Sequence, residues 1–300
     1  MSPVRRLVSY ARNYARMVSK VLKMASDVRR QPSNGFTVAG FEVLPGFLER
    51  ETCQDIIHFA NGYLQGHSYV VPPQHYRDEE VDGGKCYVHH RAEVRDINLG
   101  MVQFINVQKL DRRFSQLLAT VQKMLEARTG ESLQAQSAVI QLDMPDCETK
   151  RRLHTDGLTI RYKAFIYLSD VNGSEDGPYT VIPGSHRHVL RKIMNLFYVR
   201  WRTLTWSKEK VKRSDQFGDM AILYNERHST QVLGSAGTMT LSNQLIVHQG
   251  GYNRNPRWAI VLHFIPRKYW DGKPFNMYQQ EVESGAFPSE SLNKAQMLTD

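Results

Sequence analysis

Cysteines and long apolar runs are scarce in this 300-residue sequence. Its three cysteines, Cys53, Cys86 and Cys147, lie far apart and form no CxxC pair or other zinc-ligand spacing. Their number and spacing argue against a disulfide-rich secreted fold and a zinc finger. No apolar run approaches the roughly 18 residues of a membrane-spanning helix, and no apolar N-terminal stretch ends at a small-residue cleavage site. The length and the 41% of hydrophobic residues predict a globular, cytoplasmic protein with a substantial core.

Acidic residues are almost missing from two segments. Residues 1–30 hold eight basic residues and a single acidic one, Asp27, and residues 187–213 hold nine basic residues and only Glu209. Because the net charge of the whole chain is +9, the remainder is net negative. This distribution, without a recognisable nucleic-acid-binding motif, predicts no nucleic-acid partner and two local elements that face anions.

Residues 1–30 have the pattern of an amphipathic helix with one basic face. Their apolar residues recur at steps of three and four from Val4 to Ala25. The pattern is typical of a helix on a membrane surface, of a mitochondrial targeting helix, and of a helix packed on a domain. The sequence therefore allows a cytoplasmic, a membrane-associated or a mitochondrial location. Residues 31–35 predict a linker, so we expect one domain over residues 36–300, with residues 187–213 as a basic insertion.

The rest of the chain predicts a mainly β fold with flanking helices. A strand is expected over residues 36–44 and helices over residues 49–63 and 110–128, whereas residues 66–100 give no clear element. Short apolar stretches separated by turn residues then follow at 138–142, 160–168, 179–182, 220–223, 238–246 and 258–264. This succession predicts an all-β barrel or jelly roll.

Three side chains in the strand-rich half form a candidate metal site. His154 and Asp156 are two residues apart, so in extended chain they point to the same side, and His248 is able to complete the set. Two imidazoles and one carboxylate on one octahedral face hold non-haem Fe(II) and leave positions open for substrate and O₂. His-x-Asp alone is more often surface polarity or part of a turn, so its context matters.

A nearby arginine provides that context. Arg257 lies nine residues after His248, at the start of a predicted strand, where a guanidinium can pair with a carboxylate through two hydrogen bonds. An iron site with such an arginine indicates 2-oxoglutarate, whose distal carboxylate would pair with Arg257. Arg254, in the preceding loop, is the weaker candidate. Gln141, on the strand before His-x-Asp, is either a second cosubstrate contact or a solvated strand residue.

Several motifs in order resemble the phytanoyl-CoA dioxygenase family. After His-x-Asp come Leu168-Ser-Asp170, then Gly177-Pro178, then Pro183-Gly-Ser-His186, as in that family. The stretch Gly-Phe-Thr-Val-Ala-Gly-Phe-Glu-Val-Leu-Pro-Gly-Phe-Leu, residues 35–48, also looks like the family's opening strand and turn. The resemblance spans about residues 35–266. We interpret His186 as a structural residue that pins its loop, rather than as a further ligand.

The resemblance implies a double-stranded β-helix (jelly roll, cupin-like) with a defined site. It implies Fe(II) held by His154, Asp156 and His248, and 2-oxoglutarate as cosubstrate anchored by Arg257. Gly250 stands where the family often has a hydroxylated residue after the distal histidine.

The sequence thus predicts a 2-oxoglutarate-dependent non-haem iron dioxygenase. We expect hydroxylation of an aliphatic C–H bond in a small-molecule or lipid-like, anionic substrate, because Asp156 fills the ligand position that halogenation needs vacant. The aromatic-rich basic segment 187–213 either covers the pocket and faces an anionic substrate or membrane, or is a solvated helix packed on the barrel. The alternatives are a non-catalytic jelly-roll binding module and a peripheral membrane adaptor that works through the basic segments.

Overall fold

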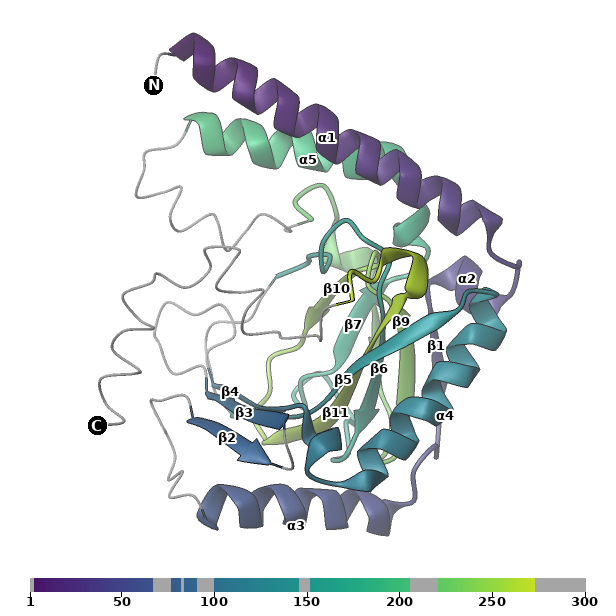
Figure 1. The fold of residues 1–300 in the computed structure, drawn as a ribbon, viewed down its shortest axis with the longest axis vertical. Helices are drawn as coiled ribbons and strands as arrows, with labels where there is room; N and C mark the ends of the chain where they lie inside the picture. Colours follow the sequence, from purple (N-terminus) through teal and green to yellow (C-terminus); the bar gives the residue numbers. More distant parts are fainter. Residues whose placement is uncertain are drawn as a thin grey trace.

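Two antiparallel sheets form the centre of the protein, in a computed structural model that describes residues 3–66, 77–81, 84–90, 100–145, 152–205 and 221–272 (Figure 1). The larger sheet has the strand order β1-β9-β6-β11-β5-β4-β3-β2, and the smaller has the order β10-β7-β8. The strands are β1 (Phe41–Leu44), β2 (Arg77–Val81), β3 (Gly84–His90), β4 (Met101–Ile105), β5 (Leu133–Asp143), β6 (Tyr162–Tyr167), β7 (Tyr179–Ile182), β8 (Thr230–Val232), β9 (Met239–Asn243), β10 (Val247–Gly250) and β11 (Arg257–Pro266). The expected mainly β fold with flanking helices is therefore confirmed as two antiparallel sheets.

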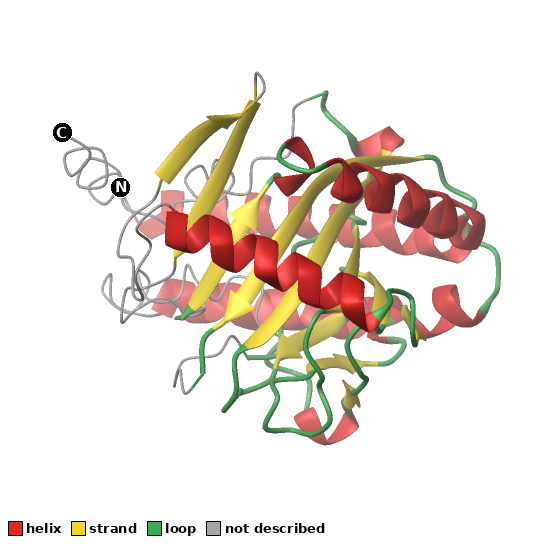
Figure 2. Ribbon diagram, turned by 90° about the horizontal axis from the view of Figure 1, so that it is seen from below, coloured by secondary structure: helices red, strands yellow, loops and turns green. Residues whose placement is uncertain are grey.

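Helices cover one face of the larger sheet (Figure 2). The helix α4 (Arg112–Thr129) buries Phe114, Leu118, Val121 and Leu125 in the main core, and α3 (Arg50–Gly66) adds Cys53, Ile56 and Ala60. Every second side chain of the central strands packs in the same core as these helices, because successive side chains of a strand point to opposite faces of the sheet. The helix expected at 110–128 is confirmed: Asp111 caps its start, and Gly130 ends it with a positive φ of 68°.

The strand expected over residues 36–44 is wrong in its first half. Residues Gly35–Ala39 form the short helix α2, because Asn34 and Thr37 make reciprocal capping hydrogen bonds. Gly40 ends α2 with a φ of +85°, and a Cβ there would lie 2.5 Å from Nδ1 of His186. Only a glycine fits both demands, so the chain turns sharply into β1.

The strand expected at 220–223 is also wrong. Residues 221–225 form a turn, and Ala221 donates its N–H to the carbonyl of Leu153 at 2.8 Å. Ala221 and Tyr224 are apolar because they pack with Leu153 and Val247, next to the two candidate ligand histidines, rather than because they form a strand. Met220 lies outside the described residues.

The expected N-terminal helix is confirmed as α1 (Pro3–Arg30), which runs antiparallel to α5 (Val189–Thr205) along one side of the molecule (Figure 1). The phenol of Tyr14 donates to the carbonyl of Ile193 at 3.2 Å, and its ring meets Phe197 edge-on. The C-terminal half of α1 is buried through three apolar residues, Val21, Met24 and Val28. Among the described helices, none combines the length and apolar character needed to cross a bilayer.

Candidate metal centre

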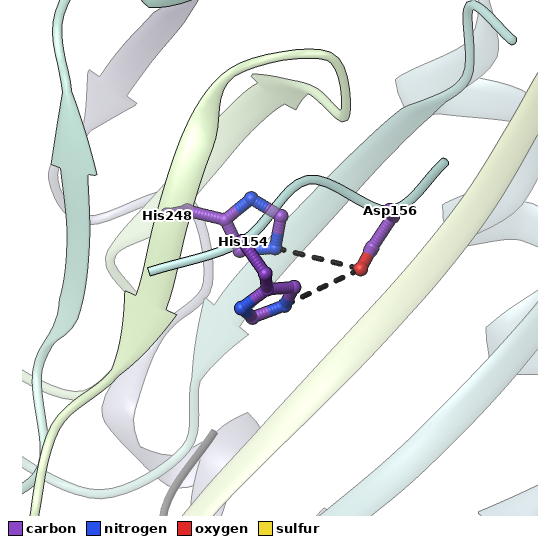
Figure 3. A group of neighbouring side chains, drawn as sticks. All are labelled: His154, Asp156 and His248. Atoms are coloured by element: carbon purple, nitrogen blue, oxygen red, sulfur yellow. Dashed lines mark ion pairs between the residues drawn. The ribbon is translucent and has the colours of Figure 1, made fainter. Parts of the chain in front are cut away.

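The structure brings His154, Asp156 and His248 together at one point (Figure 3). Their ligand atoms all lie within 4.8 Å of one another. Nε2 of His154 is 3.4 Å and Nε2 of His248 is 3.7 Å from the same Asp156 oxygen, Oδ1. His248 belongs to β10, and His154 pairs with it through two backbone hydrogen bonds of 2.9 Å. This pairing holds residues that are far apart in sequence side by side.

Backbone carbonyls fix the tautomer of both imidazoles. Nδ1 of His154 donates to the carbonyl of Arg152 at 2.7 Å, and Nδ1 of His248 donates to the carbonyl of Ile246 at 3.0 Å. With the proton on Nδ1, the lone pair of each ring is on Nε2, which faces Asp156. The site thus presents two imidazole Nε2 atoms and one carboxylate, a donor set that suits a divalent transition metal.

Burial and charge set the protonation states of His248 and Asp156. Burial, followed by the neighbouring His154 ring, lowers the pKa of His248 to about 3, so its imidazole is neutral at physiological pH. Burial raises the pKa of Asp156, but the positive charge of Lys163 and the interactions with His248 and His154 more than offset it, so the net pKa is well below the usual value. Nζ of Lys163 lies 2.5 Å from Oδ2 of Asp156. The carboxylate is therefore ionised and ready to bind a cation.

The predicted structural role of the Pro-Gly-Ser-His loop agrees with its contacts. Oγ of Ser185 accepts the N–H of Val247 at 2.8 Å, directly before His248. Nε2 of His186 donates to the carbonyl of Thr37 at 2.9 Å, so the ring joins the loop to α2. His186 is buried here, apart from the metal centre.

A second polar cluster lies on the inner face of the larger sheet. Nε of Arg257 donates to Asp143 at 3.0 Å, and its other guanidinium nitrogens reach Asp143 and the carbonyl of Gly177. Burial lowers the pKa of Arg257, and the carboxylate of Asp143 reverses this and raises it overall. The predicted cosubstrate contact Gln141 donates to Asp143 at 3.0 Å and accepts from Gln103 at 3.1 Å. Arg257 and Gln141 are thus neighbours in one buried network.

Two tyrosines lie between this network and the metal centre. The backbone N–H of Tyr179 donates to the phenol of Tyr167 at 2.9 Å, and the positive charge of Arg257 acts on that phenol. The ring centroid of Tyr179 is 5.4 Å from that of His248. Arg254, by contrast, is exposed and pairs with Glu175 at 3.3 Å.

Asp143 and Lys163 are functional candidates that the sequence analysis missed. Each is a charged residue in or at the end of a strongly apolar strand, which is the signal that could have marked them. Lys163, Phe165 and Tyr167 occupy every second position of β6, so their side chains lie on the same, inner face of the larger sheet. The partner of each charge, however, depends on strands that pair across the sheet.

Comparisons with solved structures identify the fold. The structure of SnoK, a non-haem α-ketoglutarate-dependent carbocyclase from nogalamycin biosynthesis, matches with a TM-score of 0.51 and 16% identity, over 80% of this chain and 83% of that one. HygX from Streptomyces hygroscopicus, solved with nickel, 2-oxoglutarate and hygromycin B bound, matches with a TM-score of 0.50 and 14% identity, over 79% and 87%. Neither a protein-family model nor a curated protein gives a significant match. The chain is therefore similar in fold to 2-oxoglutarate oxygenases, whose double-stranded β-helix the two sheets match.

Proposed function

We propose that this protein is an Fe(II)- and 2-oxoglutarate-dependent oxygenase, with His154, Asp156 and His248 as the metal ligands. The observation that carries the proposal is the convergence of two Nε2 atoms and one carboxylate oxygen within 4.8 Å, inside a fold that SnoK and HygX share. Three protein ligands on one side leave the other coordination positions for cosubstrate, substrate and O₂.

The residues present fit a bound Fe(II) ion. The carbonyls of Arg152 and Ile246 orient the imidazoles, and burial keeps His248 neutral and able to donate a lone pair. When bound, Fe(II) with 2-oxoglutarate supplies the oxidising chemistry, and the protein supplies position and shielding from water. A cation on Asp156 would compete with Lys163, whose ammonium would then be available to another anion.

We assign the distal carboxylate of 2-oxoglutarate to Arg257, with Gln141 as a second contact. The guanidinium is buried, and a buried carboxylate needs such a cation to offset its desolvation. In this structure the guanidinium of Arg257 pairs with Asp143. Asp143 also accepts a hydrogen bond from Gln141, so it keeps one partner when Arg257 pairs with a second carboxylate. Lys163 is the competing anchor on the same inner face.

Three matched variants separate these anchors. Arg257→Gln is expected to weaken 2-oxoglutarate binding to the Fe(II)-loaded protein at least about tenfold, because a charge-assisted pair is lost. Arg254→Gln removes an exposed arginine nearby and is expected to bind as the parent does. The measurement is calorimetric titration under anaerobic conditions. A larger loss in Lys163→Gln than in Arg257→Gln would assign the anchor to Lys163.

For the reaction, we propose hydroxylation of an aliphatic C–H bond in a small-molecule or lipid-like substrate. The structure of HygX with hygromycin B and the assignment of SnoK to nogalamycin biosynthesis support a small-molecule substrate for this fold. SnoK is a carbocyclase, so ring closure is a second outcome that the fold supports. Mass spectrometry of the product distinguishes them, because hydroxylation adds one oxygen atom and ring closure removes two hydrogens.

Succinate formation tests the proposed activity directly. Protein loaded with Fe(II) and 2-oxoglutarate is expected to release succinate and CO₂ in the presence of O₂, slowly without substrate and faster with one. His248→Ala is expected to abolish release and lower Fe(II) affinity by more than about 1,000-fold, whereas His228→Ala, an exposed histidine, is expected to change neither. Binding of Fe(II) and 2-oxoglutarate without any succinate release, across a substrate panel, would favour the non-catalytic binding module.

A further inference from the structure

An exposed apolar stripe follows the outer side of α5. Leu190, Met194, Phe197 and Trp201 are 71%, 54%, 47% and 50% exposed, and their steps of four, three and four place them on one helix face. The opposite side of α5 holds Lys192, which is buried. Four large apolar side chains in a row on the solvent side mark an interaction surface.

A basic stripe runs along the neighbouring helix α1. The exposed basic residues among those described are Arg12, Arg16, Lys20, Lys23, Arg29 and Arg30. The first four follow one another at steps of four, four and three, so they lie on one side of the helix, away from the buried Val21 and Val28. Nζ of Lys23 also lies 5.4 Å from the ring centroid of Tyr269. The acidic residue in this helix, Asp27, is turned inward, where it accepts the hydroxyl of Tyr269 and pairs with Lys268 at 3.6 Å. The outward side of α1 thus carries charge of one sign.

The two helices that carry the stripes are in contact. Phe197 belongs to the apolar stripe, and its ring meets Tyr14 of α1 with centroids 5.7 Å apart. The phenol of Tyr10 also donates to the carbonyl of Phe197, at 3.4 Å. Apolar side chains that include a tryptophan and a phenylalanine, beside a row of lysine and arginine, are the composition of interfacial helices.

We propose that α1 and α5 form a membrane-docking face for an anionic phospholipid surface. The apolar stripe enters the boundary between headgroups and acyl chains, and the basic stripe contacts lipid phosphates. Charge favours this partner over a second copy of the chain, since a twofold dimer through this face would bring two basic stripes together.

Docking by this face would place the barrel next to the bilayer. Lys192, on the buried side of α5, donates to the carbonyl of Leu245 at 2.5 Å, three residues before His248. The same helix therefore carries the apolar stripe and contacts the loop that leads to the metal centre.

Co-sedimentation with vesicles tests the proposal. The full chain is expected to bind vesicles of phosphatidylcholine with phosphatidylglycerol at least about tenfold more tightly than phosphatidylcholine alone, and less tightly as salt shortens the Debye length from about 30 to about 3 Å. The quadruple variant Arg12→Gln, Arg16→Gln, Lys20→Gln and Lys23→Gln is expected to lose at least about tenfold in affinity for the anionic vesicles. Its matched control neutralises four exposed basic residues on and near α4 and η4 (Glu226–His228), Lys109, Arg112, Lys123 and Arg227, and is expected to bind as the parent does.

A second pair of variants tests the apolar stripe. Leu190→Ser with Met194→Ser is expected to remove the salt-resistant part of binding, while Val38→Ser with Leu233→Ser, also exposed, is expected to leave it intact. Circular dichroism confirms that each variant is folded. Equal binding by the basic-stripe variant and its control would overturn the proposal. So would absence of vesicle binding together with a dimer, seen by sedimentation velocity, that the Leu190→Ser, Met194→Ser variant dissolves.

Discussion

The two faces of the larger sheet carry different chemistry. On the face covered by helices, β11 contributes Trp258, Ile260, Leu262 and Phe264, all buried in the main apolar core. The alternate residues of β11, from Arg257 to His263, face inward, where β5 adds Gln141 and Asp143. One strand therefore serves the fold with one set of side chains and the candidate site with the other. Substitutions on the two faces are therefore expected to act by different mechanisms, through cavities on the helix-covered face and through unpaired polar groups on the inner face.

The inner face combines polar groups with a small apolar belt. Ile105, Val139 and Val261 pack with Phe165, whose ring stacks on that of Tyr179 at 4.6 Å. The polar side chains on this face need hydrogen-bond or ion-pair partners, because burying a polar group without a partner lowers the free energy of unfolding. Variants on the two faces are expected to fail in different ways.

The largest effect on stability is expected from the buried ion pair of the inner face. Arg257→Ala leaves Asp143 buried and without its cation, so the free energy of unfolding is expected to fall by about 3–5 kcal/mol in urea titrations. The double variant Arg257→Leu with Asp143→Leu removes both charges and is expected to recover most of that loss. If the single and double variants are equally unstable, packing rather than unpaired charge explains the defect.

On the outer face, Ile260→Ala is expected to cost about 2–5 kcal/mol through lost burial and a residual cavity. Fe(II) affinity, measured where the variant remains folded, is expected to stay within about twofold of the parent, since Ile260 points away from the metal centre. Val261→Ala, one residue further along and on the inner face, is the matched comparison. The separation of the two faces would be wrong if Ile260→Ala weakened metal binding more than Val261→Ala.

A pH dependence is expected from Lys192. Burial lowers its pKa to about 7 from an ordinary value of 10.5, so between these values the unfolded chain binds a proton that the folded protein does not. The free energy of unfolding therefore rises with pH over this window, by as much as about 1.4 kcal/mol per pH unit. Below pH 7 the folded protein carries the buried ammonium, and the full destabilisation is present. His186, next to Lys192, has a pKa of about 4 and does not titrate there.

Lys192→Met provides the control for that slope. Chemical denaturation of parent and variant from pH 7 to 10 is expected to show the excess slope in the parent alone. Parallel curves would mean that the ammonium retains its proton in the folded protein through the carbonyl of Leu245.

The smallest effect is expected from Ser185→Ala, which leaves the buried N–H of Val247 without its acceptor. We expect a loss of about 1–3 kcal/mol in stability and about tenfold in Fe(II) affinity, because the loop that positions His248 loosens. Ser115→Ala, which removes an exposed hydroxyl from α4, is the matched control and is expected to change neither. A stability loss without any change in metal affinity would limit Ser185 to a structural role.

Local patterns in the sequence predicted much of this structure. The helices α1 and α4 and the strand β7 follow from periodicity and capping residues, and the common orientation of His154 and Asp156 at the candidate site follows from their two-residue spacing. The approach of His248 depends on its pairing with His154 across the fold. The helix α2 was missed because a capping box at Asn34 outweighed the apolar pattern of a strand. The strand predicted at 220–223 was wrong because the apolar side chain of Ala221 packs with Leu153 in a turn rather than following the period of a strand.

Sequence alone determined the periodicity of the helices and the pairing of His154 with Asp156, because these depend on residues a few positions apart. The neutralisation of Arg257 by Asp143, 114 positions away, and of Asp156 by Lys163 depended on which strands pair and which side chains face inward. Likewise, the apolar residues of α5 could have faced the barrel or the solvent, and in the folded protein Leu196 is buried whereas Leu190 and Trp201 are exposed. Charge pairing and burial are properties of neighbours in space, so they were settled by the folded chain as a whole.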